Sequence, residues 1–227
     1  MAAQTWFLSP SDFAFLWEEC KRCFYLKVVS NFRRPSPPMP KIFGVIDGLM
    51  NAHFAGKRTT DVCASLPGGV VQYGENWVQS TPIAFSTHSS KVILRGKLDT
   101  VLRFDDGSYA VVDFKSSERS DEHIPLYGRQ LHAYAYSLEN AAPNNLALKP
   151  VARLGLLVFE PNAFFGKVGG STSLSGDLVW IEIPRDDAAF LTFLDEVLDI
   201  LEQPSPPGGS AACPWCIYRD TSRRTGL

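Results

Sequence analysis

Residues 96–115 read GKLDTVLRFDDGSYAVVDFK, and this stretch decides the fold. Apolar and β-branched segments flank the turn-forming triplet at residues 105–107, which predicts a β-hairpin. Side chains alternate along a strand, so Asp113 and Lys115 share one face of the second strand. Whether Asp99 on the first strand shares that face depends on the turn.

The length of the turn sets the register of this hairpin. A two-residue turn would direct Asp99 and Asp113 to opposite faces of the sheet. A three-residue loop over residues 105–107 instead pairs Phe104 with Ser108, and its glycine takes the left-handed conformation without steric cost. We predict the three-residue loop, which places Asp99 directly opposite Asp113.

Asp99 and Asp113 in this register repel each other across two strands, an arrangement that stability alone does not favour. A divalent cation between the two carboxylates turns their mutual repulsion into a net attraction to the ion. Carboxylate oxygens are ligands that suit Mg²⁺ or Mn²⁺. Such ions keep water molecules for a phosphate substrate, and Lys115 can stabilise the charge that develops on the phosphate. The alternative is an ordinary solvated face, which the apolar run before Asp113 disfavours.

A third motif lies in the segment 126–139, whose periodicity predicts a helix. Gln130 and Tyr134 are four residues apart and therefore stand on one face of that helix. Taken alone, the pair is explained as well by a helix with one polar and one aromatic residue near the core. Because it follows the two aspartates and the lysine, we include it in the candidate site.

The rest of the chain predicts helices and strands that surround the hairpin. Ser9, Pro10 and Asp12 indicate a helix start, with Ser9 as N-cap and Asp12 closing a capping box. We expect helices at residues 9–27, 41–55 and 186–201, strands at 151–159 and 178–183, a mobile glycine-rich loop at 166–176 and a linker at 203–212. The predicted fold class is α/β, with a central mixed β-sheet flanked by helices.

The composition favours one domain spanning residues 1–227. With 227 residues and 45% apolar content, the chain can bury one sizeable core. Its net charge of −2 does not indicate nucleic acid or a membrane, so any DNA contact depends on local basic patches. No stretch approaches the length of a membrane span, and we expect a cytoplasmic protein with no membrane partner.

Basic residues gather near both ends of the chain. They are Lys21, Arg22, Lys27, Arg33 and Arg34 near the N-terminus, and Arg219, Arg223 and Arg224 near the C-terminus. If the two ends meet, these residues form a basic rim that suits a DNA backbone. Scattered surface charge is the alternative.

Four of the five cysteines form two C-x-x-C pairs, Cys20 with Cys23 and Cys213 with Cys216. In a reducing cytosol this pattern favours metal ligation over disulfides. Cys20 and Cys23 lie one turn apart on the predicted first helix, and the linker can bring the second pair to them. We predict one metal centre that joins the N- and C-terminal segments. A [4Fe-4S] cluster is our expectation, with Zn²⁺ or unmetallated thiols as alternatives.

The order of these motifs resembles the RecB-like branch of the PD-(D/E)XK nucleases, which includes RecB and AddB nuclease domains and small CRISPR-associated exonucleases. The resemblance covers most of the chain, from the helix start at Ser9 to Cys216, and implies a restriction-endonuclease-like fold. It implies a Mg²⁺- or Mn²⁺-dependent deoxyribonuclease, an exonuclease on single-stranded or end-containing DNA. The implied roles are metal ligands for Asp99, Asp113 and the carbonyl of Phe114, catalytic lysine for Lys115, and active-site and DNA-positioning groups for Gln130 and Tyr134.

One departure from that family concerns the third metal ligand. The family usually places a histidine on a helix before the sheet, shortly after a glycine, and residues 43–48 contain none. Asp47 is the substitute we expect, and His53 is the second choice. The missing histidine keeps open a catalytically weak or inactive nucleic-acid-binding module, and a cysteine-metal structural domain is a third interpretation. The presence of Asp99, Asp113 and Lys115 argues against both.

Overall fold

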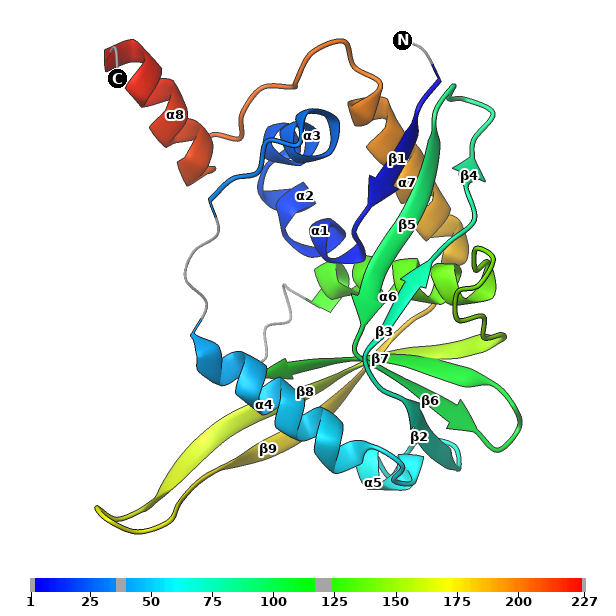
Figure 1. Ribbon diagram of the computed structural model, residues 1–227, viewed down its shortest axis with the longest axis vertical. Coiled ribbons are helices and arrows are strands. Elements are labelled where there is room, and N and C mark those ends of the chain that lie inside the picture. The colour runs from blue at the N-terminus through cyan, green and yellow to red at the C-terminus, as the bar shows by residue number, and fades with distance from the viewer. Residues whose placement is uncertain (1–2, 36–39, 117–123, 226–227) are drawn as a thin grey trace.

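Two mixed β-sheets form the centre of the structure (Figure 1). A computed structural model describes residues 3–35, 40–116 and 124–225. The larger sheet has five strands in the order β2 (Gly69–Tyr73), β6 (Thr100–Phe104), β7 (Tyr109–Ser116), β8 (Val151–Gly166) and β9 (Thr172–Ile183). In this sheet β7 and β8 run parallel, and the other neighbours are antiparallel.

The smaller sheet is built around one strand, β5. Its strands are β1 (Thr5–Leu8), β5 (Lys91–Leu98), β3 (Asn76–Gln79) and β4 (Ile83–Ala84). The predicted α/β class with mixed sheet flanked by helices is confirmed, and its strands are divided between two sheets. β5 ends at Leu98 and β6 begins at Thr100, so Asp99 is the junction between the sheets rather than a residue within the hairpin strand.

Helices cover both faces of the larger sheet. α6 (Ile124–Glu139) packs on one face, where Leu131 and Val111 belong to one apolar cluster. α4 (Lys41–Phe54) packs on the other, where Phe54 meets Val112 and Phe114. Because Val112 and Phe114 face α4, the alternating residues Asp113 and Lys115 face the side of α6.

The predicted first helix is broken into three. These are α1 (Pro10–Ala14), α2 (Leu16–Glu19) and α3 (Lys21–Ser30), and Cys20 between the last two is extended, with φ −167° and ψ 107°. The capping box is also absent, because Asp12 pairs with Lys27 at 2.5 Å instead of closing back on the helix start. Apolar periodicity continues through the break, which explains why the sequence suggested one helix.

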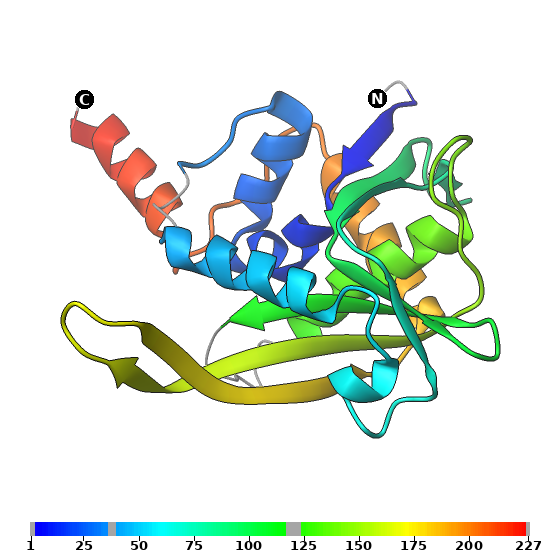
Figure 2. The same cartoon turned by 60° about the horizontal axis from the view of Figure 1, so that its bottom comes forward.

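The glycine-rich segment is mostly strand. β8 and β9 form a long hairpin in which Gly166 pairs with Thr172, and its end extends past α4 (Figure 2). The mobile loop expected at residues 166–176 is therefore wrong for residues 172–176. Residues 172–176 are mostly small or polar, and their composition predicts a loop. They form a strand because they pair with β8.

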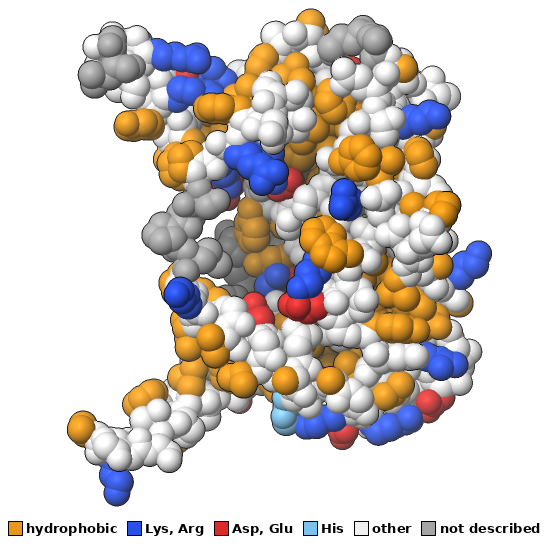
Figure 3. Space-filling view, in the orientation of Figure 1, with side chains coloured by type: hydrophobic (Ala, Val, Ile, Leu, Met, Phe, Trp, Pro, Cys, Tyr) orange, Lys and Arg blue, Asp and Glu red, His pale blue; other side chains and the backbone are white. Residues whose placement is uncertain are grey.

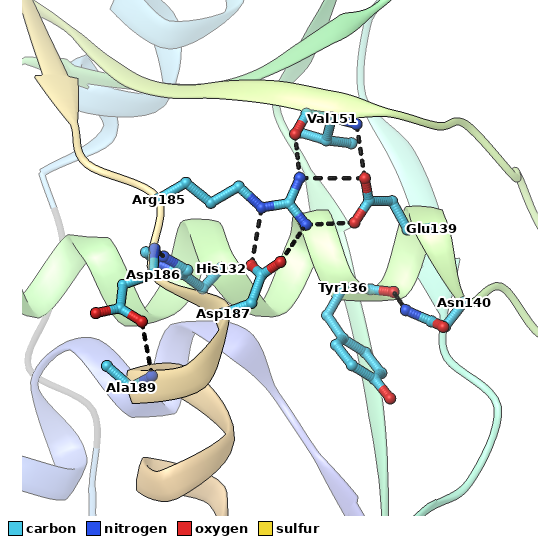
Figure 4. Close-up of polar contacts among 9 residues, drawn as sticks. All are labelled: His132, Tyr136, Glu139, Asn140, Val151, Arg185, Asp186, Asp187 and Ala189. Atoms are coloured by element: carbon cyan, nitrogen blue, oxygen red, sulfur yellow. Dashed lines mark hydrogen bonds and ion pairs between the residues drawn. The ribbon is translucent and has the colours of Figure 1, made fainter.

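α7 (Asp187–Leu201) is fixed to α6 by polar contacts around Arg185 (Figure 4). The guanidinium pairs with Glu139 of α6 and with Asp187 at 2.7 Å. His132, 8% exposed, accepts a hydrogen bond from the backbone N–H of Asp186 at 2.8 Å, so its other ring nitrogen donates to the carbonyl of Gly128. This histidine is structural.

The remaining elements are two helices. α5 (Thr59–Val62) is short, and α8 (Pro214–Thr225) follows the linker at residues 203–212, which contains neither helix nor strand. The second cysteine pair lies at the start of α8, with Cys213 just before the helix and Cys216 in its first turn. Within the described residues, every helix is too short or too polar to cross a bilayer.

Candidate active site and metal centre

The hairpin has the predicted three-residue register. Thr100 pairs with Val112, and the N–H of Phe104 donates to the carbonyl of Ser108 at 2.8 Å. Gly107 has φ +87°, the left-handed conformation that this loop requires. The residue before Thr100 and the residue after Val112 are Asp99 and Asp113, which therefore lie opposite each other as predicted.

Asp113 is buried and Asp99 is half-buried. Asp113 is 3% exposed, and Asp99 accepts a hydrogen bond at Oδ2 from the backbone N–H of Phe114 at 3.1 Å. Burial, followed by the charge of Asp113, raises the pKa of Asp99 to about 7. A pair of facing acidic groups with one raised pKa is typical of a functional site.

Lys115 supplies the positive charge of this site. Its Nζ forms an ion pair with Asp113 and lies 4.9 Å from the centre of the Tyr127 ring. Burial would lower the pKa of Lys115, but the charges of Asp113 and Asp99 raise it above its ordinary value. The lysine is therefore positively charged in the metal-free protein.

One face of α6 holds this group in place. Gln130 donates from Nε2 to Oδ1 of Asp113 at 3.1 Å, and the hydroxyl of Tyr134 donates to the carbonyl of Lys97 at 2.7 Å. Tyr127 was not singled out in the sequence. The spacing of residues 127, 130 and 134 on one helix face is the signal that would have identified it.

Gly96 begins the G-x-x-D motif for a steric reason. A Cβ at this position would lie 2.8 Å from Cδ of Pro10 and 3.2 Å from the ring of Tyr134. Any larger residue would push α1 or α6 away from β5. The glycine thus allows Tyr134 to reach the carbonyl of Lys97.

Asp47 comes to the site from α4, on the other side of the sheet. Its Oδ1 is buried and has no hydrogen-bond partner within the described part of the chain. Burial raises the pKa of Asp47, while Lys115 lowers it and Asp113 raises it, so all three groups are close. His53 is exposed and contacts Lys57 at 2.8 Å, outside the cleft.

These residues line one cleft of about 810 Å³, which we call the acidic cleft. It contains Asp47, Asp99, Asp113, Phe114, Lys115, Gln130 and Tyr134. Figure 3 shows a hollow above α4 with acidic and basic side chains at its edge. Three carboxylates, one with a buried unpartnered oxygen, fit a hard divalent cation.

The two cysteine pairs converge, as predicted. All four sulfurs lie within 4.8 Å of one another, all four residues are buried, and none forms a disulfide. Contrary to the expected helical turn, Cys20 is the N-cap of α3 and only Cys23 is helical. Cys213 and Cys216 likewise lie at the start of α8, so two helix N-termini favour thiolates here.

The thiols of this cluster differ in acidity. Burial raises the pKa of Cys20, but backbone hydrogen bonds from Ser210 and Cys23 outweigh it and lower the value to about 7. Burial and the neighbouring sulfurs raise the pKa of Cys216 to about 11. Four thiolates at this spacing require a cation, and their donor chemistry fits a thiophilic metal.

The basic residues at the two ends differ in their partners. Lys27 pairs with Asp12, Arg34 with Glu19, and Arg22 with Asp220 at 3.1 Å. Within the described residues, Arg33 and Arg223 form no ion pair or hydrogen bond. The rim therefore contains free cations as well as neutralised ones.

Comparisons with known proteins identify the family. The family model described as PD-(D/E)XK nuclease superfamily matches residues 57–221, a range that contains the hairpin, α6 and the second cysteine pair. A solved structure described as "Crystal structure of SSO0001" is 17% identical, with a TM-score of 0.43, covering 88% of this chain and 78% of that chain. None of the curated proteins compared with the chain matches it.

Proposed function

This chain belongs to the PD-(D/E)XK nuclease superfamily, and from that premise we propose that it is a divalent-metal-dependent deoxyribonuclease. The observation that carries the proposal is the acidic cleft, where half-buried Asp99 lies opposite buried Asp113 with Lys115 beside them. Two carboxylates that face each other away from bulk solvent repel, so stability alone does not explain their position.

The residues of the cleft have separate roles in this proposal. Asp99, Asp113 and the carbonyl of Phe114 would hold Mg²⁺ or Mn²⁺, with Asp47 in place of the usual histidine. The ion, when bound, supplies Lewis acidity and an activated water. Lys115 stabilises negative charge on the phosphate. Gln130 keeps Asp113 oriented, and the ring of Tyr127 limits the positions that Lys115 can adopt.

The substrate and the mode of cleavage follow from the resemblance to the RecB-like branch. We propose an exonuclease that acts on single-stranded or end-containing DNA. Arg33, which lines the cleft and has no ion pair within the described residues, supports a polyanionic substrate. The free thiols of the cysteine pairs suit a reducing compartment, which supports a cytoplasmic location.

The cysteine centre supports zinc more than the [4Fe-4S] cluster expected from the sequence. Three sulfur pairs lie 3.6, 3.7 and 3.7 Å apart. Sulfurs bound to one Zn²⁺ at about 2.3 Å stand about 3.8 Å apart at the corners of a tetrahedron. A cluster places four iron ions between the thiolates and needs a wider spacing. We therefore propose a structural zinc ion.

A cleavage assay tests the proposed activity. Purified protein is incubated with Mg²⁺ or Mn²⁺ and end-labelled single-stranded or double-stranded DNA, with single-stranded RNA of the same sequence for comparison. We expect Lys115→Ala to lower the cleavage rate by at least about 100-fold, because it removes a charge stabiliser. Lys91→Ala at the start of β5, outside the cleft, is the matched control.

The second candidate function is an inactive nucleic-acid-binding module, which the missing histidine favours. Binding of DNA without cleavage in either metal would support it and reject the enzyme. Cleavage by Lys115→Ala at the wild-type rate would reject the assignment of the site.

A further inference from the structure

Two further hollows lead away from the acidic cleft. A connecting hollow of about 270 Å³ shares Ser11, Asp12, Lys27 and Arg33 with the cleft. It shares Cys23 and Arg34 with a distal pocket of about 400 Å³, which lies between α8 and the segment after α3. Each hollow therefore shares lining residues with the next, from the acidic cleft to the distal pocket.

The distal pocket has an aromatic lining. Phe32 is 55% exposed and Tyr218 is 73% exposed, and Trp215 completes the group. Large aromatic side chains at this exposure stabilise the fold little, so their presence in one hollow calls for a ligand. Flat rings that are accessible to solvent suit nucleobases, which stack on them regardless of sequence.

Arginines surround these rings. Arg34, Arg219 and Arg223 line the distal pocket, and no acidic residue lines it within the described part of the chain. Arg223 forms no ion pair or hydrogen bond with any described residue, and neither does Arg33 in the connecting hollow. Figure 3 shows basic and hydrophobic side chains next to one another over α8. The unpaired guanidinium of Arg223 beside the aromatic rings, and that of Arg33 in the connecting hollow, fit phosphates of a strand whose bases lie on the rings.

We propose that a single strand of DNA runs from the acidic cleft past Arg33 to the distal pocket, where unpaired bases stack on Phe32, Trp215 and Tyr218. The inference rests on the proposed nuclease function and specifies its substrate. A duplex keeps its bases paired and stacked, so its bases cannot reach these rings.

The cysteine centre has a place in this path. Cys23 lines both the connecting hollow and the distal pocket, and Trp215 lies between the two cysteines of the second pair. The bound metal would fix α8 beside α3 and so position one wall of the pocket. The path thus depends on both ends of the chain.

Binding of a nuclease-resistant strand tests the path independently of cleavage. The probe is a fluorescein-labelled phosphorothioate oligothymidine of about 20 nucleotides, followed by anisotropy with the full-length protein. We expect Tyr218→Ala to weaken binding at least about fivefold, the loss of one stacked base. Arg223→Gln should lower the dependence of log affinity on log salt by about 0.7. A duplex of the same length should bind both variants as it binds the wild type.

Matched controls separate the path from general effects. Ile217→Ala removes another exposed residue of α8, and Arg103→Gln removes an exposed arginine of β6. Neither residue lines the cleft, the connecting hollow or the distal pocket, so both variants should bind as the wild type. If the wild type cleaves DNA but Tyr218→Ala and Arg223→Gln bind the probe unchanged, the path is wrong and the nuclease proposal stands. If the two variants lose as much affinity for the duplex as for the single strand, the proposed path is also wrong. If the wild type neither binds nor cleaves DNA, both proposals fail.

Discussion

At the scale of single residues, the site depends on charges held at close range. Asp99 and Asp113 face each other, Lys115 neutralises part of their charge, and Gln130 holds one carboxylate. Because the pKa of Asp99 is raised to about 7, this carboxyl retains its proton below about pH 7 when no cation is present. Divalent cation and proton therefore compete for the same carboxylate.

This competition predicts a pH dependence of stability. The pKa of Asp99 is about 7 in the folded chain, above the ordinary value of an aspartate, so the folded state binds the proton more tightly than the unfolded state. The contribution of this bound proton to the free energy of unfolding is fully present below about pH 4, and it is lost as the pH rises to about 7. Without added divalent cation, the wild type should lose up to about 2 kcal/mol more than Asp99→Asn between about pH 5 and pH 8. Urea unfolding measures this, and a pH-independent difference contradicts it.

At the scale of elements, α6 connects the site to the rest of the protein. One face carries Tyr127, Gln130 and Tyr134, and its C-terminal end carries Glu139, which pairs with Arg185 (Figure 4). The position of the helix is thus fixed from outside the site as well as within it.

Replacement of Arg185 tests how much that contact contributes. The side chains of Arg185 and Glu139 are 22% and 18% exposed, so Arg185→Met leaves a carboxylate poorly solvated. We expect the free energy of unfolding to fall by about 1–3 kcal/mol. Arg153→Met breaks a more exposed pair, in which the side chains are 38% and 42% exposed, and should cost less than about 1 kcal/mol. If Arg185→Met and Arg153→Met lowered the free energy of unfolding equally in urea or thermal unfolding, this prediction would be wrong.

Local chemistry explains which elements the sequence predicted. The turn at Gly107 and strand alternation fixed the faces of Asp99 and Asp113, because both depend on neighbouring residues. The break at Cys20 and the pairing of residues 172–176 with β8 were missed, because they depend on contacts with distant segments. The division into two sheets was missed for the same reason, since β5 and β6 are one residue apart and differ only in their partners.

At the scale of the whole molecule, the cysteine centre joins segments at both ends of the chain. Cys20 and Cys216 are in contact although almost all of the sequence separates them. Linking them restricts the unfolded chain, and a bound metal adds its binding free energy to the folded state. This joining supports the proposal that residues 1–227 form one domain.

Loss of the centre should release α8. We expect purified protein to be colourless with about one zinc ion per chain. Cys216→Ser should lower the zinc content and the melting temperature, and expose the linker at residues 203–212 to protease. Cys63→Ser, outside the cluster, is the control. Brown protein that contains iron would replace zinc with a cluster, and unchanged metal content in Cys216→Ser would reject the shared centre.

The register of the hairpin also restricts how this protein can change during evolution. Insertion of a single residue into the paired part of β6 or β7 reverses the alternation of that strand and turns one carboxylate away from the other. A residue gained in β6 keeps the two aspartates opposite each other only with a matching residue in β7. Length changes in these two strands should therefore occur in pairs, whereas the turn at residues 105–107 and the turn of the β8–β9 hairpin can change length singly.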